Sequence, residues 1–349
     1  MRIKKERYGF VNHQAIFEYT LTNSNELSVS VITYGGIITK IIMPDRYDDL
    51  GEITVNMTTL DEIIQERPFH GAIVGPVAGR ISGARYIDED KCVELEKNEN
   101  GNTLHSGSTG LDTKIWEAET EENEKESSLI LTTTLKDGEC GFPGDVQVKV
   151  TYTVNEENEL KIKYEAETNK RTLFNPTNHV YFNLSGNYEN SIYAHDIQVN
   201  SNHYASLNED NIPTGELKAV TDTAFDLREG NKLGNVIINK EEEIVLRKGL
   251  DHPFLVNPHS QEPIVKLSNV ASGRVLEIET DRDAIVIYTH NHIQKSATGK
   301  DRLLWMHSGI ALETQQLPDA VNQKGFGSIW LEPGEHFTST TKYKFSIME

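Results

Sequence analysis

The sequence predicts an all-β protein, a large antiparallel β-sandwich with a few short helices. Apolar and polar side chains alternate in segments along the whole chain, which is the period of a strand with one buried face. Asn, Gly, Asp and Pro separate these segments at short spacing, and helical patterns are few. No Pro- or Ser-rich linker and no internal repeat divides the 349 residues, so we expect a single domain over residues 1–349.

The alternation locates individual strands. Apolar side chains occupy every second position from Val148 to Val154, stop at Asn155–Asn158 and resume from Leu160 to Ala166, which predicts a hairpin. Between Leu27 and Met43, β-branched runs are broken by Gly35 and Gly36, which indicates a bend or bulge. Further strands are predicted at 129–135, 276–278, 285–288 and 343–347.

Two other segments have distinct patterns. Thr58 to Glu66 is a helix candidate, with Thr59 placed before Leu60, Asp61 and Glu62. Glu119 to Ser128 is rich in charge, and we interpret it as a solvated loop.

The composition limits the partners of the protein. Its 34 Lys and Arg against 54 Asp and Glu give a formal net charge of −20 at pH 7. Phosphate backbones and anionic membranes recruit basic side chains, so neither nucleic acid nor a membrane surface is expected as a partner. The same charge favours a soluble protein that is a monomer or a weak homodimer.

The sequence also indicates a compartment. No run of about 18 apolar residues is present, so no transmembrane helix is expected. Residues 1–21 contain basic side chains but no uninterrupted apolar stretch, which argues against a secretory signal. The two cysteines, Cys92 and Cys140, give neither a disulfide framework nor a zinc-site spacing. We therefore expect a cytoplasmic protein.

Four segments have more polar side chains than strand packing requires. A carboxylate and an imidazole, which several of them supply, can act as a base and an acid near neutral pH. Glu313 and Asp251 could instead be a glycosidase carboxylate pair, and the sequence leaves this open. The segments are 102–107, 174–183, 249–254 and 311–322.

Cofactor sites have weaker signals. His290 and His292 could present two imidazoles on one strand face, but no third ligand follows at a characteristic spacing. The glycine-rich stretches 101–110 and 325–327 lack the strand-to-helix context of a nucleotide site. We therefore predict no metal, and the glycine-rich stretches give little reason to expect a nucleotide.

Taken in order, the polar segments resemble the aldose 1-epimerase family. The resemblance runs from Tyr34 to Phe345 and so covers nearly the whole chain. Its most specific pieces are Asn175–His179 and Leu312–Gln315 with Pro318 and Asp319 following; Asp137–Gly144 is another family-like stretch.

The resemblance implies a galactose mutarotase-like β-supersandwich and a small-molecule aldose as substrate. It implies interconversion of the α and β anomers of free hexoses such as galactose and glucose, without a cofactor. By the same resemblance Glu313 is the general base and His179 the general acid. His105, Asp251 and Arg80 would contact the sugar.

The chain departs from the family pattern at several positions. Pro76 stands where the family has a first arginine, and Gly79 where it has an asparagine. Ser106 replaces a glycine, and Leu250 replaces a frequent tyrosine. These changes affect the expected sugar preference more than the reaction.

Three alternative functions remain. A hexose-6-phosphate 1-epimerase would want several Arg or Lys at its site. A non-catalytic carbohydrate-binding or sensor protein would need neither proton-transfer residue. A sugar hydrolase or lyase would need a water or leaving-group site. An aromatic platform for the sugar could come from Tyr288, Trp305 or Phe326, although aromatic residues in strands are usually core.

Overall fold

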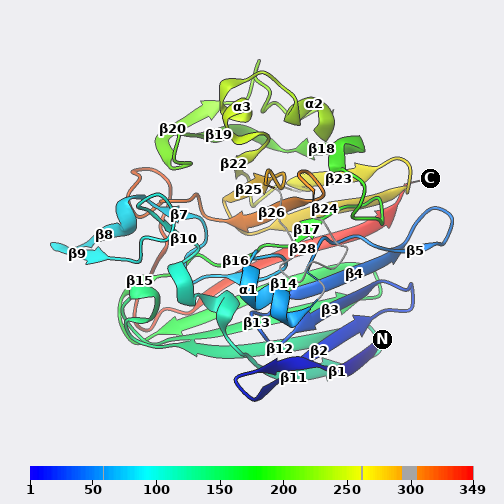
Figure 1. The fold of residues 1–349 in the computed structure, drawn as a ribbon, viewed down its shortest axis with the longest axis horizontal. Helices are drawn as coiled ribbons and strands as arrows, with labels where there is room; N and C mark the ends of the chain where they lie inside the picture. The colour runs from blue at the N-terminus through cyan, green and yellow to red at the C-terminus, as the bar shows by residue number, and fades with distance from the viewer. Residues whose placement is uncertain (58, 261, 293–304, 349) are drawn as a thin grey trace.

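The computed structural model describes residues 1–57, 59–260, 262–292 and 305–348. It confirms the all-β prediction: three large antiparallel sheets and four short two-stranded ladders make up most of the regular structure. Figure 1 shows the sheets stacked from β1 and β11 at one end of the molecule to the α2 and α3 region at the other.

The largest sheet has nine strands and contains the predicted 148–166 hairpin. Val150 pairs with Tyr164 across this hairpin, and the apolar side chains of both strands are buried. In spatial order the strands are β11 (Glu117–Glu122), β12 (Glu126–Leu135), β13 (Val146–Asn155), β14 (Glu159–Thr168), β28 (Phe337–Ile347), β24 (Arg274–Thr280), β23 (Val265–Asn269), β18 (His195–Val199) and β21 (Asn231–Lys232).

A six-stranded sheet lies beside it. Nearly all residues of its central strands are buried, as expected for strands that are covered on both faces. In spatial order the strands are β17 (Tyr181–Phe182), β26 (Ile310–Gln315), β25 (Ala284–Tyr288), β22 (Asp251–Val256), β19 (Ser201–Leu207) and β20 (Pro213–Ala219).

The N-terminal part of the chain forms the third sheet. Gly35 and Gly36 make the bend predicted between its third and fourth strands, and both have the positive φ that favours glycine. The strands are β1 (Arg2–Val11), β2 (Gln14–Thr22), β3 (Ser28–Ile32), β4 (Ile38–Pro44) and β5 (Leu50–Glu52). The two-stranded ladders pair β6 (Ile73–Val74) with β16 (Thr177–Asn178), β7 (Arg80–Ile81) with β10 (Thr103–Leu104), β8 (Arg85–Asp88) with β9 (Lys91–Glu94), and β15 (Thr172–Leu173) with β27 (Trp330–Leu331).

The helices are short, as predicted. The candidate at 58–66 is α1 (Leu60–Glu66), and Thr59 caps it in a reciprocal capping box with Glu62. Thr58 lies outside the described residues. The other two are α2 (Leu233–Ile237) and α3 (Glu242–Arg247). Among the described residues, none of the helices has the length and apolar character that crossing a membrane requires.

The main core is a contiguous cluster of buried apolar side chains from all three large sheets. Tyr152 on β13 crosses between layers, and its hydroxyl donates to the carbonyl of Gly36 at 2.6 Å. Burying a large aromatic side chain is favourable, and this bond removes the cost of burying its hydroxyl. The single domain expected over 1–349 stays a prediction.

The prediction of a loop at 119–128 is wrong. Glu117–Glu122 is the edge strand β11, and β12 begins at Glu126, so only 123–125 turns. The strand is hard to recognise because most of its side chains are exposed and acidic. Charged side chains on an edge strand discourage pairing with another chain, which explains why the pattern resembles a loop.

Candidate active site

A pocket of about 450 Å³ opens over one face of the six-stranded sheet. Figure 1 shows the two-stranded ladder of β7 and β10 beside the ends of β25 and β26. Residues of this ladder and its flanking loops form the wall of the pocket that faces the six-stranded sheet. The structure brings all five predicted site residues to this pocket: Arg80, His105, His179, Asp251 and Glu313. Its volume is in the range of small-molecule sites.

Sheet register explains why the two carboxylates share the pocket. On β26, Glu313 lies opposite Val286 of β25, which lies opposite Pro253 of β22. Asp251 is two residues before Pro253, so it points to the same face of the sheet. The two carboxylates are therefore two strands apart, roughly 10 Å between backbones.

His179 reaches Glu313 from the chain between β16 and β17. Its backbone N–H donates to the carbonyl of Ala72 at 2.9 Å, and Thr177 donates through its hydroxyl to the carbonyl of Thr314 at 3.0 Å. The first bond fixes the segment beside β6, and the second fixes it against β26. His179 Nε2 then lies 3.3 Å from Glu313 Oε1.

Both members of this pair are buried, with 5% of His179 and 3% of Glu313 exposed. Gln315 donates from Nε2 to the other oxygen of Glu313, Oε2, at 3.3 Å. The carboxyl group is thus held on both oxygens, which leaves little freedom for its plane to rotate.

Burial disfavours the charged form of each partner. It raises the pKa of Glu313 to about 8; the charge of Asp251 adds to this shift, and Arg80 opposes it. It lowers the pKa of His179 to about 4, which the charge of Asp251 only partly opposes. At a pH between these two pKa values, Glu313 and His179 together hold one titratable proton. Burial favours the state in which Glu313 carries this proton and both groups are neutral.

His105 is the second imidazole of the pocket. Its ring Nδ1 accepts from the backbone N–H of Gly79 at 3.2 Å. Burial lowers the pKa of His105 well below its ordinary value, and the charges of His179 and Arg80 add to the effect. The ring is therefore neutral, and since Nδ1 accepts, Nε2 carries the proton and is a donor.

Arg80 is held between two carboxylates. Its Nε and Nη2 donate to Glu99 at 2.5 and 3.0 Å, a bidentate pair. Its Nη1 lies 3.6 Å from Asp251 Oδ2. Sequence reasoning missed Glu99, because nothing in the sequence distinguishes it from the other acidic residues.

Two aromatic residues at the pocket were also missed. Tyr181 lies 5.0 Å from His179 between ring centroids, and Phe69 lies 4.8 Å from His105. Of the three aromatic candidates, Tyr288 lines the pocket. Phe326 is in the core and Trp305 is half exposed, and neither is among the described lining residues.

The two unusual positions of the 75–81 segment differ in their relation to the pocket. Gly79 lines it with a φ of 74°, a left-handed conformation that a side chain would strain. Pro76 is not among the described lining residues; its carbonyl accepts from the backbone N–H of Asn175.

The expectation that His290 and His292 share a strand face is wrong. Strand β25 ends at Tyr288, and His290 has a φ of 49°, which turns the chain. His290 is buried against Tyr181, whereas His292 is exposed. In the described part of the chain, no three His, Cys, Asp or Glu side chains gather in a way that could hold a metal ion.

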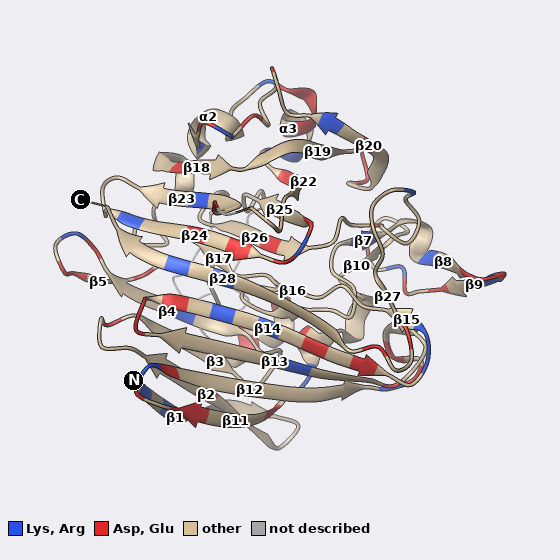
Figure 2. Ribbon diagram, turned by 180° about the vertical axis from the view of Figure 1, so that it is seen from behind, with Lys and Arg blue, Asp and Glu red and all other residues tan. Residues whose placement is uncertain are grey.

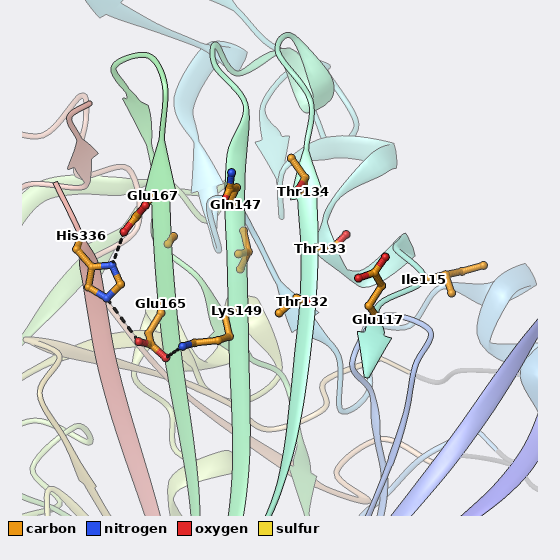
Figure 3. Close-up of a pocket in the computed structure, with 12 residues that line it drawn as sticks. Ile115, Glu117, Thr132, Thr133, Thr134, Gln147, Lys149, Glu165, Glu167 and His336 are labelled. Atoms are coloured by element: carbon orange, nitrogen blue, oxygen red, sulfur yellow. Dashed lines mark hydrogen bonds and ion pairs between the residues drawn. The ribbon is translucent and has the colours of Figure 1, made fainter. Parts of the chain in front are cut away.

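A second hollow, which we call the outer groove, lies on the exposed face of the nine-stranded sheet (Figure 3). Its volume is about 470 Å³. His336 lies 3.0 Å from Glu167 and 3.5 Å from Glu165, and Lys149 lies 2.8 Å from Glu165. Figure 2 shows acidic and basic residues interspersed along β14, which forms part of this groove.

The fold and the pocket define the class of the protein: a large antiparallel β-sandwich with a buried carboxyl–imidazole pair in a pocket of small-molecule size. The model of the aldose 1-epimerase family matches residues 18–344. The chain therefore belongs to the aldose 1-epimerase family, which confirms the resemblance seen in its motifs.

Individual relatives agree with this assignment. The galactose mutarotase of Homo sapiens is 36% identical over 93% of this chain and 92% of its own length. The aldose 1-epimerase of Streptococcus thermophilus is 32% identical over 96% of this chain and 95% of its own. The crystal structure of galactose 1-epimerase from Lactobacillus acidophilus NCFM is 28% identical, covers 100% of this chain and 99% of that chain, and superposes with a TM-score of 0.90.

Proposed function

We propose that this protein is an aldose 1-epimerase that interconverts the α and β anomers of free hexoses such as galactose and glucose. The observation that carries the proposal is the buried pair of Glu313 and His179, 3.3 Å apart in a pocket of sugar size. The identities of the relatives support the same reaction.

Ring opening assigns a role to each partner. A cyclic aldose is a hemiacetal, so Glu313 removes the proton of the C1 hydroxyl while His179 protonates the ring oxygen. The ring opens to an aldehyde, rotation about C1–C2 presents the other carbonyl face, and the reverse transfers close the ring. General acid–base help of this kind contributes about 10²–10⁴-fold to the rate.

The proton count of the pair suits this reaction. The opening step needs a Glu313 carboxylate and a His179 imidazolium, which together hold one proton. Without sugar in the pocket, Glu313 and His179 also share one titratable proton between pH 4 and pH 8, and it lies on Glu313. Moving it to His179 prepares ring opening, and the resting arrangement is the one that recloses the ring.

The other pocket residues bind the sugar. Asp251, Arg80 and the neutral His105 supply an acceptor and donors for its hydroxyls. We propose a monomer or weak homodimer that acts in the cytoplasm without nucleic acid or membrane partners, in line with the net charge of −20.

Polarimetry tests the proposal. Freshly dissolved α-D-galactose and α-D-glucose are followed with native protein and with Glu313→Gln, and anomer exchange of D-glucose 6-phosphate is followed by NMR. We expect native protein alone to speed relaxation of the free sugars to an unchanged final rotation. The ratio of the two rates would rank the sugars.

Other results would replace the proposal. Acceleration restricted to the sugar phosphate would assign a hexose-6-phosphate 1-epimerase. Binding of galactose without acceleration of any sugar would assign a non-catalytic binder. Full activity in Glu313→Gln would remove Glu313 from its role as the base.

A further inference from the structure

Both arginines among the described residues of the pocket wall are already paired with carboxylates. Arg67 donates from Nε and Nη2 to Asp112 at 2.6 and 2.9 Å. Arg80 makes the same bidentate contact with Glu99. Each pair occupies the Nε/Nη2 edge of the guanidinium and opposes its positive charge, which would otherwise attract a phosphate or carboxylate.

The two pairs differ in what they mean for a ligand. Arg67 lines the pocket with 26% of its side chain exposed, but its partner Asp112 is buried and is not among the described lining residues. Glu99 lines the pocket itself. The exposed fraction is 29% for the side chain of Glu99 and 15% for that of Arg80. Of the two, only the Arg80 pair lies next to Asp251 and so at the proposed sugar-binding groups.

A tight turn holds Glu99 in place. The backbone of Glu99 pairs with that of Asn102 in both directions, at 2.7 and 3.2 Å. Between them Asn100 and Gly101 both have positive φ, the pattern of a two-residue type I′ turn. The carboxylate therefore reaches Arg80 from a fixed backbone, and losing its charge leaves the turn intact.

Two carboxylates oppose the charge of Arg80. Nε and one hydrogen of Nη2 donate to Glu99, and Nη1 lies 3.6 Å from Asp251. The remaining N–H groups on Nη1 and Nη2 can donate to a sugar hydroxyl, but the positive charge that would attract a phosphate or carboxylate is already offset. The carboxylates of Glu99 and Asp251 would also repel an anion at this position.

We propose that Glu99 is a specificity-determining residue: by pairing with Arg80 and offsetting its charge, it makes the pocket select neutral aldoses over sugars that carry an anionic group. The inference rests on the proposed function, because it concerns the sugar that the same pocket accepts. It also names Glu99 as a positioning residue, since it acts on the sugar through Arg80.

The test compares Glu99→Gln with Glu94→Gln, an exposed acidic residue at the end of β9. Both substitutions change the net charge by the same amount, but only the first removes the negative charge that is paired with Arg80. For each protein, galactose mutarotation gives kcat and KM, and D-glucose 6-phosphate and neutral D-xylose are tested as inhibitors. The ratio of the two inhibition constants measures the preference for a neutral sugar.

In Glu99→Gln we expect the inhibition constant of D-glucose 6-phosphate to fall about tenfold relative to that of D-xylose. The KM of galactose should rise while kcat changes less, because Arg80 loses its fixed position. Glu94→Gln should resemble native protein, and Glu99→Asp, which keeps the charge, should restore the neutral preference at least in part.

Three results would overturn the inference. The ratio could stay unchanged in Glu99→Gln, it could shift equally in Glu94→Gln, or native protein could already bind the sugar phosphate as tightly as the neutral sugar. None of these affects the proposed function, which fails only if native protein does not speed galactose mutarotation. Native activity is therefore measured first, so that the two failures are distinguishable.

Discussion

The pocket and the outer groove offer a direct comparison, since they have similar volumes of about 450 and 470 Å³ and each sets a histidine beside a glutamate. In the pocket, His179 lies 3.3 Å from Glu313, and 7% and 4% of their side chains are exposed. In the groove, His336 lies 3.5 Å from Glu165, and 52% of the His336 side chain is exposed. Both sites therefore share their size and a histidine–glutamate contact, but the groove histidine is far more exposed and two lysines also contact the groove glutamate.

The comparison shows how burial and neighbouring cations act on a carboxyl group. Desolvation works against ionisation of Glu165 as well, but hydrogen bonds from Lys149 and Lys163 outweigh it and lower the pKa of Glu165. Glu313 has no lysine beside it among the described residues, and its pKa rises to about 8. A carboxyl group near neutrality can both take and return a proton, whereas a permanently ionised one can only hold a charge.

The largest expected effect separates the two histidines. His179→Asn removes the proposed acid, so kcat for galactose mutarotation should fall about 10²–10⁴-fold. His336→Asn in the outer groove should leave kcat within experimental error. Polarimetry measures both, and thermal unfolding checks that both variants fold. An equal loss in the two variants would mean that burial does not distinguish the sites.

The next effect concerns sugar binding. Asp251→Asn removes a charged acceptor for sugar hydroxyls, so the KM of galactose should rise about tenfold, with a smaller fall in kcat. Asp196→Asn, at an exposed ion pair with Lys232, is the matched control. A KM unchanged from native would argue against Asp251 as a binding group.

The pH profile is expected to change more modestly between variants. In native protein kcat/KM should be bell-shaped, with limbs near pH 4 and pH 8, because the pair gains a second proton below the first and loses its single proton above the second. The charge of Asp251 raises the pKa of Glu313, so Asp251→Asn should move the basic limb to lower pH. A limb that stays in place would show that Glu313 does not control it.

The smallest effect belongs to the groove itself. Lys149→Ala breaks a partly exposed ion pair with Glu165, and such pairs contribute about 0–1 kcal/mol to the free energy of unfolding. Urea unfolding should therefore detect little change, and mutarotation should be unaffected. A loss of activity here would mean that the outer groove also serves the reaction.

The sequence predicted strands where one face is buried. The 148–166 hairpin was recognisable because its inward positions are apolar and its outward positions polar. Strand β11 escaped recognition because most of its side chains face water, so no hydrophobic period marks it. The strand predicted at 285–288 ends at Tyr288, as β25 does, but the turn at His290 was missed because local residue types do not reveal a positive φ.

Motifs located the candidate site, but its geometry came from tertiary structure. Asn175–His179 and Leu312–Gln315 stood out through their similarity to a family. That His179 and Glu313 meet depends on the contact of the 177–179 segment with β26, which no local pattern records. Glu99 lacks even a motif, because its importance comes from its distance to Arg80 alone.

Strand β28 has a consequence for how the chain is made. It occupies the middle of the nine-stranded sheet, hydrogen-bonded to β14 on one side and β24 on the other, yet it follows both of them in the sequence. During synthesis β14 and β24 must therefore wait with unpaired edges until Phe337–Ile347 has left the ribosome. Unpaired edges are where aggregation begins, so we expect the nascent chain to depend on chaperones late rather than early in translation.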